Sequence, residues 1–119
     1  MRRHQIHLAV VLFALIAIAG CKVDPAPPSL DDAKVVWSNI NKQLGLDKEL
    51  ELVDLKKTDG QMAEVNGVKV YTFYYEVRKR HLTRMGNWKP GDIETVQSNY
   101  GFQKTENGWQ GPEGTHFPH

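Results

Sequence analysis

The sequence predicts an α+β domain in which one N-terminal helix packs on an antiparallel sheet of about four strands. Two observations lead to this prediction. A helical stripe of apolar residues follows Ser29, and segments typical of strands, separated by tight-turn dipeptides, follow Gly45. One helix followed by successive hairpins is typical of α+β domains, in which helices cover one face of the sheet. The chain before Ser29 carries signals of another kind.

The first 20 residues have the pattern of an export signal. Arg2 and Arg3 precede residues 8–19, a run of 12 apolar residues. A helix needs about 20 such residues to cross a bilayer, so this run is too short for a permanent span. A basic start, a short apolar run and small residues before the cut are typical of a secretory signal peptide. We expect residues 1–20 to be removed.

The signal ends in Ile18, Ala19, Gly20 and Cys21, which resemble the lipobox of bacterial membrane lipoproteins. The resemblance implies that a dedicated peptidase cuts before Cys21, that its thiol receives a diacylglycerol and that its new amine is acylated. Several acyl chains make a stable membrane anchor. Many inner-membrane lipoproteins of Gram-negative bacteria carry an aspartate where this chain has Lys22. The resemblance therefore implies the periplasmic face of the outer membrane.

Cys21 is the only cysteine of the chain. The alternative to lipid attachment is an ordinary buried thiol that follows a signal peptide cut elsewhere. A lone cysteine directly after Gly20 favours lipid attachment, because unpaired thiols are unusual in oxidising compartments. With no second cysteine, no intramolecular disulfide can form.

Without its signal the chain is close to neutral. The full chain has 15 Lys and Arg against 14 Asp and Glu, and removal of residues 1–20 takes two arginines and no acid. Domains that bind nucleic acid are usually strongly basic, so we expect no nucleic-acid partner. Residues 21–28 contain three prolines and predict a short extended tether behind the lipidated cysteine. Residues 29–119 are long enough for one modest domain.

The predicted helix begins at Ser29. This residue and Asp32 have the spacing of a helix N-cap and its capping box. Apolar residues recur at intervals of three and four up to Gly45, where the helix is expected to end; they are Leu30, Ala33, Trp37, Ile40 and Leu44. We interpret Trp37 as the core residue that seats the helix on the sheet.

Residues 48–58 fit a helix or a strand, but Gly45 before them and Asp59-Gly60 after them favour a first strand. Asn66-Gly67 predicts a tight turn because both residues tolerate positive φ. Residues 68–80 then give the longest strand signal. One face of that strand should meet the helix and carries Tyr71, Phe73, Tyr75 and Val77. The opposite face is partly apolar, either as tolerated surface or as a dimer or partner surface, and carries Val68, Val70, Thr72 and Tyr74.

Residues 81–92 contain several glycines, a proline and an asparagine and predict a loop. Two final strands, 93–105 and one from Trp109 onward, are joined by a turn that ends at Gly108. In the first of them Val96, Tyr100 and Phe102 should point into the core, and Gly101 is a candidate β-bulge. The last strand should be short or broken, because Gly111, Pro112 and Gly114 follow Trp109.

This element order, with residues 57–61, 66–71 and 102–109, resembles small uncharacterised bacterial lipoproteins with cystatin-like or NTF2-like folds. A larger NTF2-like domain has more helices around a conical pocket than the single helix expected here. The resemblance rests on turns and aromatic residues and implies no particular chemistry.

The mature chain contains little that predicts catalysis or metal binding. His116 and His119 lack the further ligands of a zinc site, and we interpret them as part of a loose C-terminal tail. His81 with Asp92 or Glu94 is an acid-base pair only if the strand ends converge. We therefore expect no enzyme, no metal and no cofactor.

One charged segment is more basic than its surroundings. No acidic residue occurs between positions 78 and 89. We name as the basic tip the residues Arg78, Lys79, Arg80, Arg84, Trp88 and Lys89. Such a patch suits an anionic partner, with the tryptophan as a flat contact. The alternative is a strand end whose cations prevent edge pairing.

We therefore expect a non-catalytic, lipid-anchored envelope lipoprotein that is held at the membrane through Cys21. It would bind another envelope protein or an anionic envelope component through the sheet face or the basic tip. One alternative is a small-molecule binder or enzyme with a pocket between helix and sheet. Another is an immunity or inhibitor protein against an envelope toxin.

Overall fold

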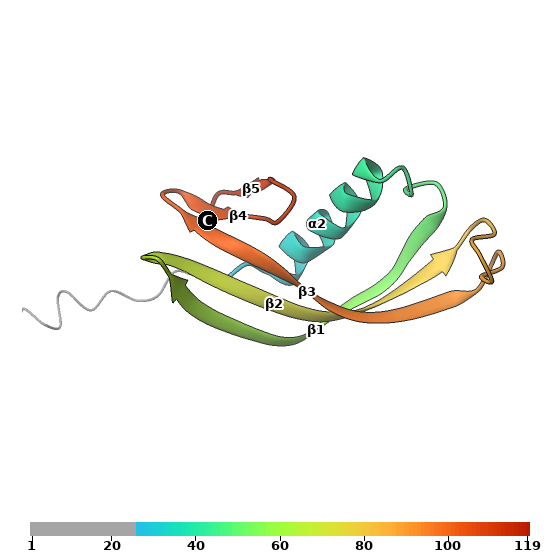
Figure 1. Ribbon diagram of the computed structural model, residues 1–119, viewed down its shortest axis with the longest axis horizontal. Helices are drawn as coiled ribbons and strands as arrows, with labels where there is room; N and C mark the ends of the chain where they lie inside the picture. Colours follow the sequence, from blue (N-terminus) through green and yellow to red (C-terminus); the bar gives the residue numbers. More distant parts are fainter. Residues whose placement is uncertain (1–25) are drawn as a thin grey trace, which may run out of the picture.

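The computed structural model describes residues 26–119 (Figure 1). The expected signal peptide, Cys21 and most of the tether lie outside the described residues. The described elements are α2 (Leu30–Gln43), β1 (Leu50–Val65), β2 (Val68–His81), β3 (Ile93–Thr105), β4 (Gly108–Gln110) and β5 (His116–Phe117). All strands form one antiparallel sheet in the order β1-β2-β3-β4-β5. The α+β prediction is confirmed, and the expected four strands are close to the five observed.

The start of α2 follows the sequence prediction. The Asp32 amide donates to the Ser29 hydroxyl at 3.1 Å, and the Ser29 amide donates to the Asp32 carboxylate at 2.9 Å. The buried face is rotated slightly from the predicted stripe, because Val36 is fully buried beside Ala33 while Leu44 is 66% exposed. Trp37 packs against the core and stays partly exposed. In this part of the chain, no helix has the length and hydropathy needed to cross a membrane.

The strand interpretation of residues 48–58 is confirmed, but β1 continues past Asp59-Gly60 to Val65. The pairing of β1 with β2 shifts by one residue between Leu52 and Asp54 and again between Lys57 and Asp59. Asp59-Gly60 therefore adjoins a β-bulge and does not form a turn. A Cβ on Gly60 would lie 1.8 Å from the Tyr71 hydroxyl, so the glycine allows this ring to cross the strand.

The hairpin between β1 and β2 forms at Asn66 and Gly67, whose φ angles are 52° and 83°. Val65 pairs with Val68 directly across this two-residue turn. The face of β2 predicted to meet the helix is buried, as expected, and consists of Tyr71, Phe73, Tyr75 and Val77.

The predicted bounds of β3 are confirmed, and Tyr100 and Phe102 are buried. The expected bulge at Gly101 is wrong, because the register between β2 and β3 is continuous and pairs Gly101 with Thr72. The bulges of the described sheet lie in its outer strand β1, at the two shifts in its pairing with β2.

The C-terminal segment is ordered, and the expectation of a loose tail is wrong. The chain reverses after Gly111, whose amide donates to the Thr115 carbonyl at 2.8 Å. β5 then pairs with β4, and Phe117 is buried edge-on against Phe102, with 5.9 Å between ring centroids. The sequence signal for this strand was weak because β5 has only two residues.

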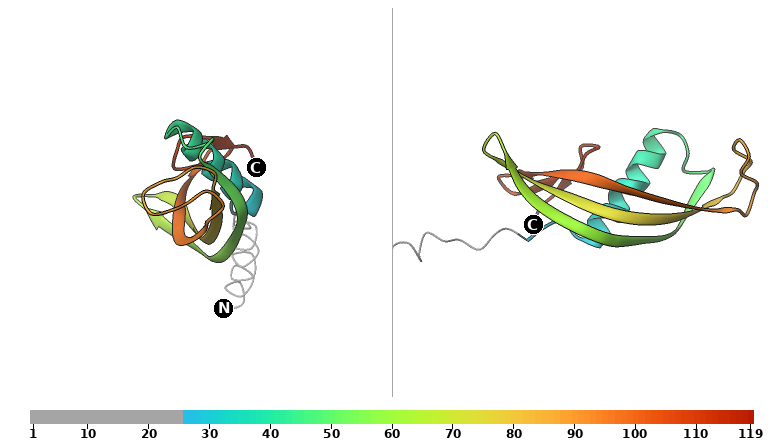
Figure 2. Two further views of the ribbon diagram at one scale, coloured as in Figure 1. Left: turned by 90° about the vertical axis from the view of Figure 1, so that its right-hand side faces the viewer. Right: turned by 60° about the horizontal axis from the view of Figure 1, so that its bottom comes forward.

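Figure 1 shows α2 and the β4–β5 pair on the same side of a curved ribbon formed by β1, β2 and β3. The second view of Figure 2 shows the β2–β3 loop extending beyond the helix at one end of this ribbon. β4 and β5 adjoin α2, since Asn39 donates to both Glu113 and Thr115. The core fills the space between these two layers. The described sheet is therefore covered along only part of its length.

A candidate binding groove between helix and sheet

A groove of about 350 Å³ lies between the C-terminal half of α2 and the sheet face beneath it. We call it the groove. The helix and the turn after it contribute Trp37, Ile40, Asn41, Leu44 and Leu46. The sheet contributes Leu50, Tyr75, Val77, Lys79, Val96, Ser98, Asn99 and Tyr100.

The groove follows from a difference in length between the helix and the strands. α2 ends at Gln43, and the chain turns away at Gly45 with φ +73°. β2 and β3 continue past this point to the loop that joins them (Figure 1). The paired residues Val77 and Val96 lie on the part of the sheet face that lines the groove. The end of the helix therefore leaves an apolar surface incompletely covered.

Polar groups lie at the bottom of the groove. Asn41 is buried, and its side-chain amide donates to the Trp37 carbonyl at 2.8 Å. The rings of Tyr75 and Tyr100 lie 4.6 Å apart. Burial raises the pKa of Tyr100 far above its ordinary value, and a side-chain hydrogen bond with Tyr75 adds to the increase. The Tyr100 side chain is therefore a neutral phenol at physiological pH.

The raised pKa of Tyr100 predicts a loss of stability at high pH. Folding keeps the phenol protonated, so this contribution is complete below the ordinary pKa of 10.0 and declines as pH rises above it. We expect Tyr100→Phe to show a smaller decrease in unfolding free energy than the unsubstituted protein between pH 9 and 11, measured by urea unfolding. Tyr74→Phe, on the opposite face of β2, is the control. An equal alkaline loss in Tyr100→Phe would contradict the assignment.

Lys79 lies at the end of the groove nearest the β2–β3 loop. Its ammonium nitrogen is 3.9 Å from Glu94 Oε1, and its side chain is 23% exposed. The same carboxylate oxygen lies 2.8 Å from His81 Nε2. The groove therefore has apolar walls and a cation beside a carboxylate at one end.

The structure brings His81 and Glu94 together, one of the pairings that the sequence left open. The Asp92 backbone carbonyl accepts from the His81 amide at 2.8 Å, whereas the Asp92 carboxylate accepts from the Lys89 amide. Trp88 stacks on the imidazole with ring centroids 4.9 Å apart and planes at 4°. Only 1% of His81 is exposed, and its Nδ1 has no hydrogen-bond partner in the described residues. The pair holds the loop on the sheet, with the imidazole almost fully enclosed and the Glu94 carboxylate partly exposed.

The basic tip does not form a single cationic face. Arg78 and Arg80 alternate with Lys79 along β2, so they point to the side opposite the groove. Arg80 forms an ion pair with Glu51 of β1, and Lys79 lies near Glu94 of β3. Both acids lie outside the segment between positions 78 and 89, so the sequence count omitted them. Arg84, Trp88 and Lys89 are exposed in the loop.

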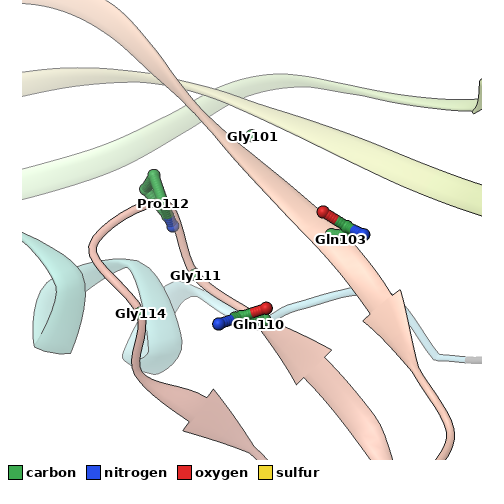
Figure 3. Close-up of a pocket in the computed structure, with 6 residues that line it drawn as sticks. All are labelled: Gly101, Gln103, Gln110, Gly111, Pro112 and Gly114. Carbon is green, nitrogen blue, oxygen red and sulfur yellow. The ribbon is translucent and has the colours of Figure 1, made fainter.

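A second hollow of about 270 Å³ lies near β4 (Figure 3). Gln103 and Gln110 line it from the neighbouring strands β3 and β4, and Pro112 and Gly114 lie in the turn that follows β4. It contains no charged side chain among its lining residues and little apolar surface. It is a weaker candidate for a ligand site than the groove.

The histidines near the C-terminus serve structural contacts. Thr105 Oγ1 lies 3.1 Å from His116 Nε2, and His119 Nε2 lies 2.7 Å from Asp32. Across residues 26–119, no three His, Cys, Asp or Glu side chains gather as metal ligands.

Comparison with known protein families, curated proteins and solved structures finds no match for this chain. The two features of this chain that bear on its function are therefore the lipobox pattern and the groove. The groove itself was missed by sequence reasoning beyond the general alternative of a pocket between helix and sheet. The available signal was Leu44, which continues the apolar stripe one residue past the end of the helix.

Proposed function

We propose that this chain is a non-catalytic bacterial lipoprotein that binds another envelope component in the groove. The anchor is the lipid on Cys21, and the expected location is the periplasmic face of the outer membrane. The observation that carries the binding proposal is the partly open apolar groove of about 350 Å³ at the end of α2. Ligand sites are typically concave, mainly apolar and supplied with a few polar groups.

A role without catalysis is supported by the surroundings of the one histidine near the groove. His81 is held between Glu94 and Trp88 and is almost completely buried. A general base must come within hydrogen-bond distance of the proton that it removes. Trp88 covers one face of this imidazole and Glu94 takes up its Nε2, which restricts the access of a substrate to the ring.

The basic tip is the competing binding surface. Trp88 is 39% exposed and shares the loop with Arg84 and Lys89, neither of which forms an ion pair within the described part of the chain. The groove is favoured because it is concave and apolar, whereas acids from β1 and β3 neutralise part of the tip.

The test is a photo-reactive amino acid placed at single positions of the full-length chain in intact cells. Val96 lies in the groove, whereas its neighbour Thr95 points to the opposite face of β3. Arg84 samples the basic tip. We expect irradiation to give a discrete adduct from position 96, detected by intact mass, and little adduct from position 95. An adduct from position 84 alone would contradict the groove as the binding site and would favour the basic tip.

A further inference from the structure

We infer that the groove binds a single-chain amphiphile with an anionic headgroup. This inference rests on the proposed function and names the class of ligand that the groove would bind. The hydrocarbon chain lies along the apolar wall between α2 and the sheet. The headgroup, a carboxylate or a phosphate, lies at Lys79. Three features of the groove lead to this assignment: its cation, its apolar wall and the pairing of its backbone.

Lys79 has hydrogen-bonding capacity that no side chain or carbonyl within residues 26–119 uses. Its ammonium carries three donors, and 3.9 Å to Glu94 Oε1 is an ion-pair distance beyond that of a hydrogen bond. The same Glu94 oxygen already has His81 Nε2 at 2.8 Å. An anionic headgroup can therefore accept hydrogen bonds from Lys79 without removing the contact that Glu94 makes with His81.

The apolar wall suits one hydrocarbon chain. Trp37, Ile40 and Leu44 form its helix side, while Val77 and Val96 form its sheet side. At about 350 Å³ the groove lies at the small end of the range of ligand pockets, a size that suits one hydrocarbon chain of moderate length. Leu44 is 66% exposed, and a bound chain would cover this side chain.

An extended peptide fits the groove less well. The floor is the face of paired strands, where the backbone groups of β2 and β3 bond to each other. Buried peptide amides would need partners, and the Asn41 amide already donates to the Trp37 carbonyl. A hydrocarbon chain needs no such partners. Peptides that add to a sheet use its edges, which here are β1, β5 and the part of β3 before Gln103, and not the face beneath the groove.

The experiment uses the full lipoprotein in phosphatidylcholine nanodiscs. Dodecanoic acid with a terminal diazirine is added, the sample is irradiated, and the labelled residues are mapped by mass spectrometry. We expect saturable labelling of groove residues that dodecanoate and dodecyl phosphate prevent, with the two competitors distinguishing a carboxylate from a phosphate source. Dodecanol should compete more weakly, and each methylene removed from the competitor should lower its affinity about fourfold.

Lys79→Gln should lower the affinity about tenfold, the loss expected for one charge-assisted hydrogen bond. Arg78→Gln removes the same charge from the opposite face of β2 and should have no effect. Glu94→Gln removes the competing negative charge and should raise the affinity. A misfolded variant cannot give this increase, so the pair of substitutions separates a binding effect from a folding effect.

The outcomes separate this inference from the proposed function. Labelling that falls outside the groove, or that dodecanoate does not prevent, overturns the inference that the ligand is an amphiphile. Equal competition by dodecanol, together with no effect of Lys79→Gln, overturns the anionic headgroup. In either case an adduct from position 96 in cells would leave the groove as a binding site. The absence of both kinds of adduct would overturn the two proposals together.

Discussion

Trp109→Ala is expected to destabilise the domain by about 3–5 kcal/mol, the usual cost of removing a fully buried tryptophan. Trp109 is 0% exposed and lies edge-on to Tyr71, with ring centroids 6.3 Å apart. Its indole N–H donates to the Ala26 carbonyl at 2.8 Å, and Lys104 lies over its ring. The side chain therefore joins β4, β2 and the segment before α2.

Small domains have a total stability of about 5–15 kcal/mol, so this single change should remove a large part of it. Each kcal/mol shifts the melting temperature of a domain of this size by roughly 4–8 °C. We expect thermal unfolding of Trp109→Ala to begin more than about 12 °C lower. Trp88→Ala is the matched control, because Trp88 is 39% exposed and stacks on His81 at the loop. Equal decreases in the melting temperature of the two variants would contradict the claim that Trp109 is a main stabilising residue of the core.

Cys21→Ser is expected to abolish membrane anchoring. The hydroxyl of serine does not replace the thiol that the lipobox resemblance assigns to lipid attachment, so neither lipidation nor the cut before residue 21 should occur. The measurements are incorporation of labelled palmitate and the intact mass of the protein. The unsubstituted protein should incorporate the label and begin at Cys21, whereas the variant should do neither.

Lys22→Asp is the control for this prediction. It leaves the cysteine in place and should preserve lipid incorporation while moving the protein to the inner membrane. If Cys21→Ser were instead exported and cut normally, Cys21 would be an ordinary thiol behind a conventional signal peptide. The prediction that a lipid on Cys21 anchors the protein to the membrane would then be wrong.

The sequence predicted those parts of the fold that local interactions determine. The helix start needs only Ser29 and Asp32, which satisfy each other's hydrogen bonds within one turn. The hairpin at Asn66 and Gly67 needs only two residues that adopt positive φ. Alternation along β2 likewise identified the buried face, because in a sheet with one covered face the apolar side chains of a strand point toward the core.

Features that depend on distant contacts could not be predicted in this way. Asp59-Gly60 has the composition of a turn, but it pairs with Tyr74 and Phe73 of β2, so the strand continues through it. The pairing of Arg80 with Glu51 depends on the register of β1 and β2. The groove arises because α2 ends before the strands beneath it do, and no local pattern records that difference.

The central claim is that the groove holds an envelope component in the anchored protein. The most direct measurement is the yield of photo-adduct from position 96 relative to position 95 in intact cells. These neighbours share the same strand and differ in the face to which they point, so access of the reagents is closely matched. The account predicts a discrete adduct mass at position 96 and a several-fold lower yield at position 95. Equal yields, or no adduct at position 96, would contradict it.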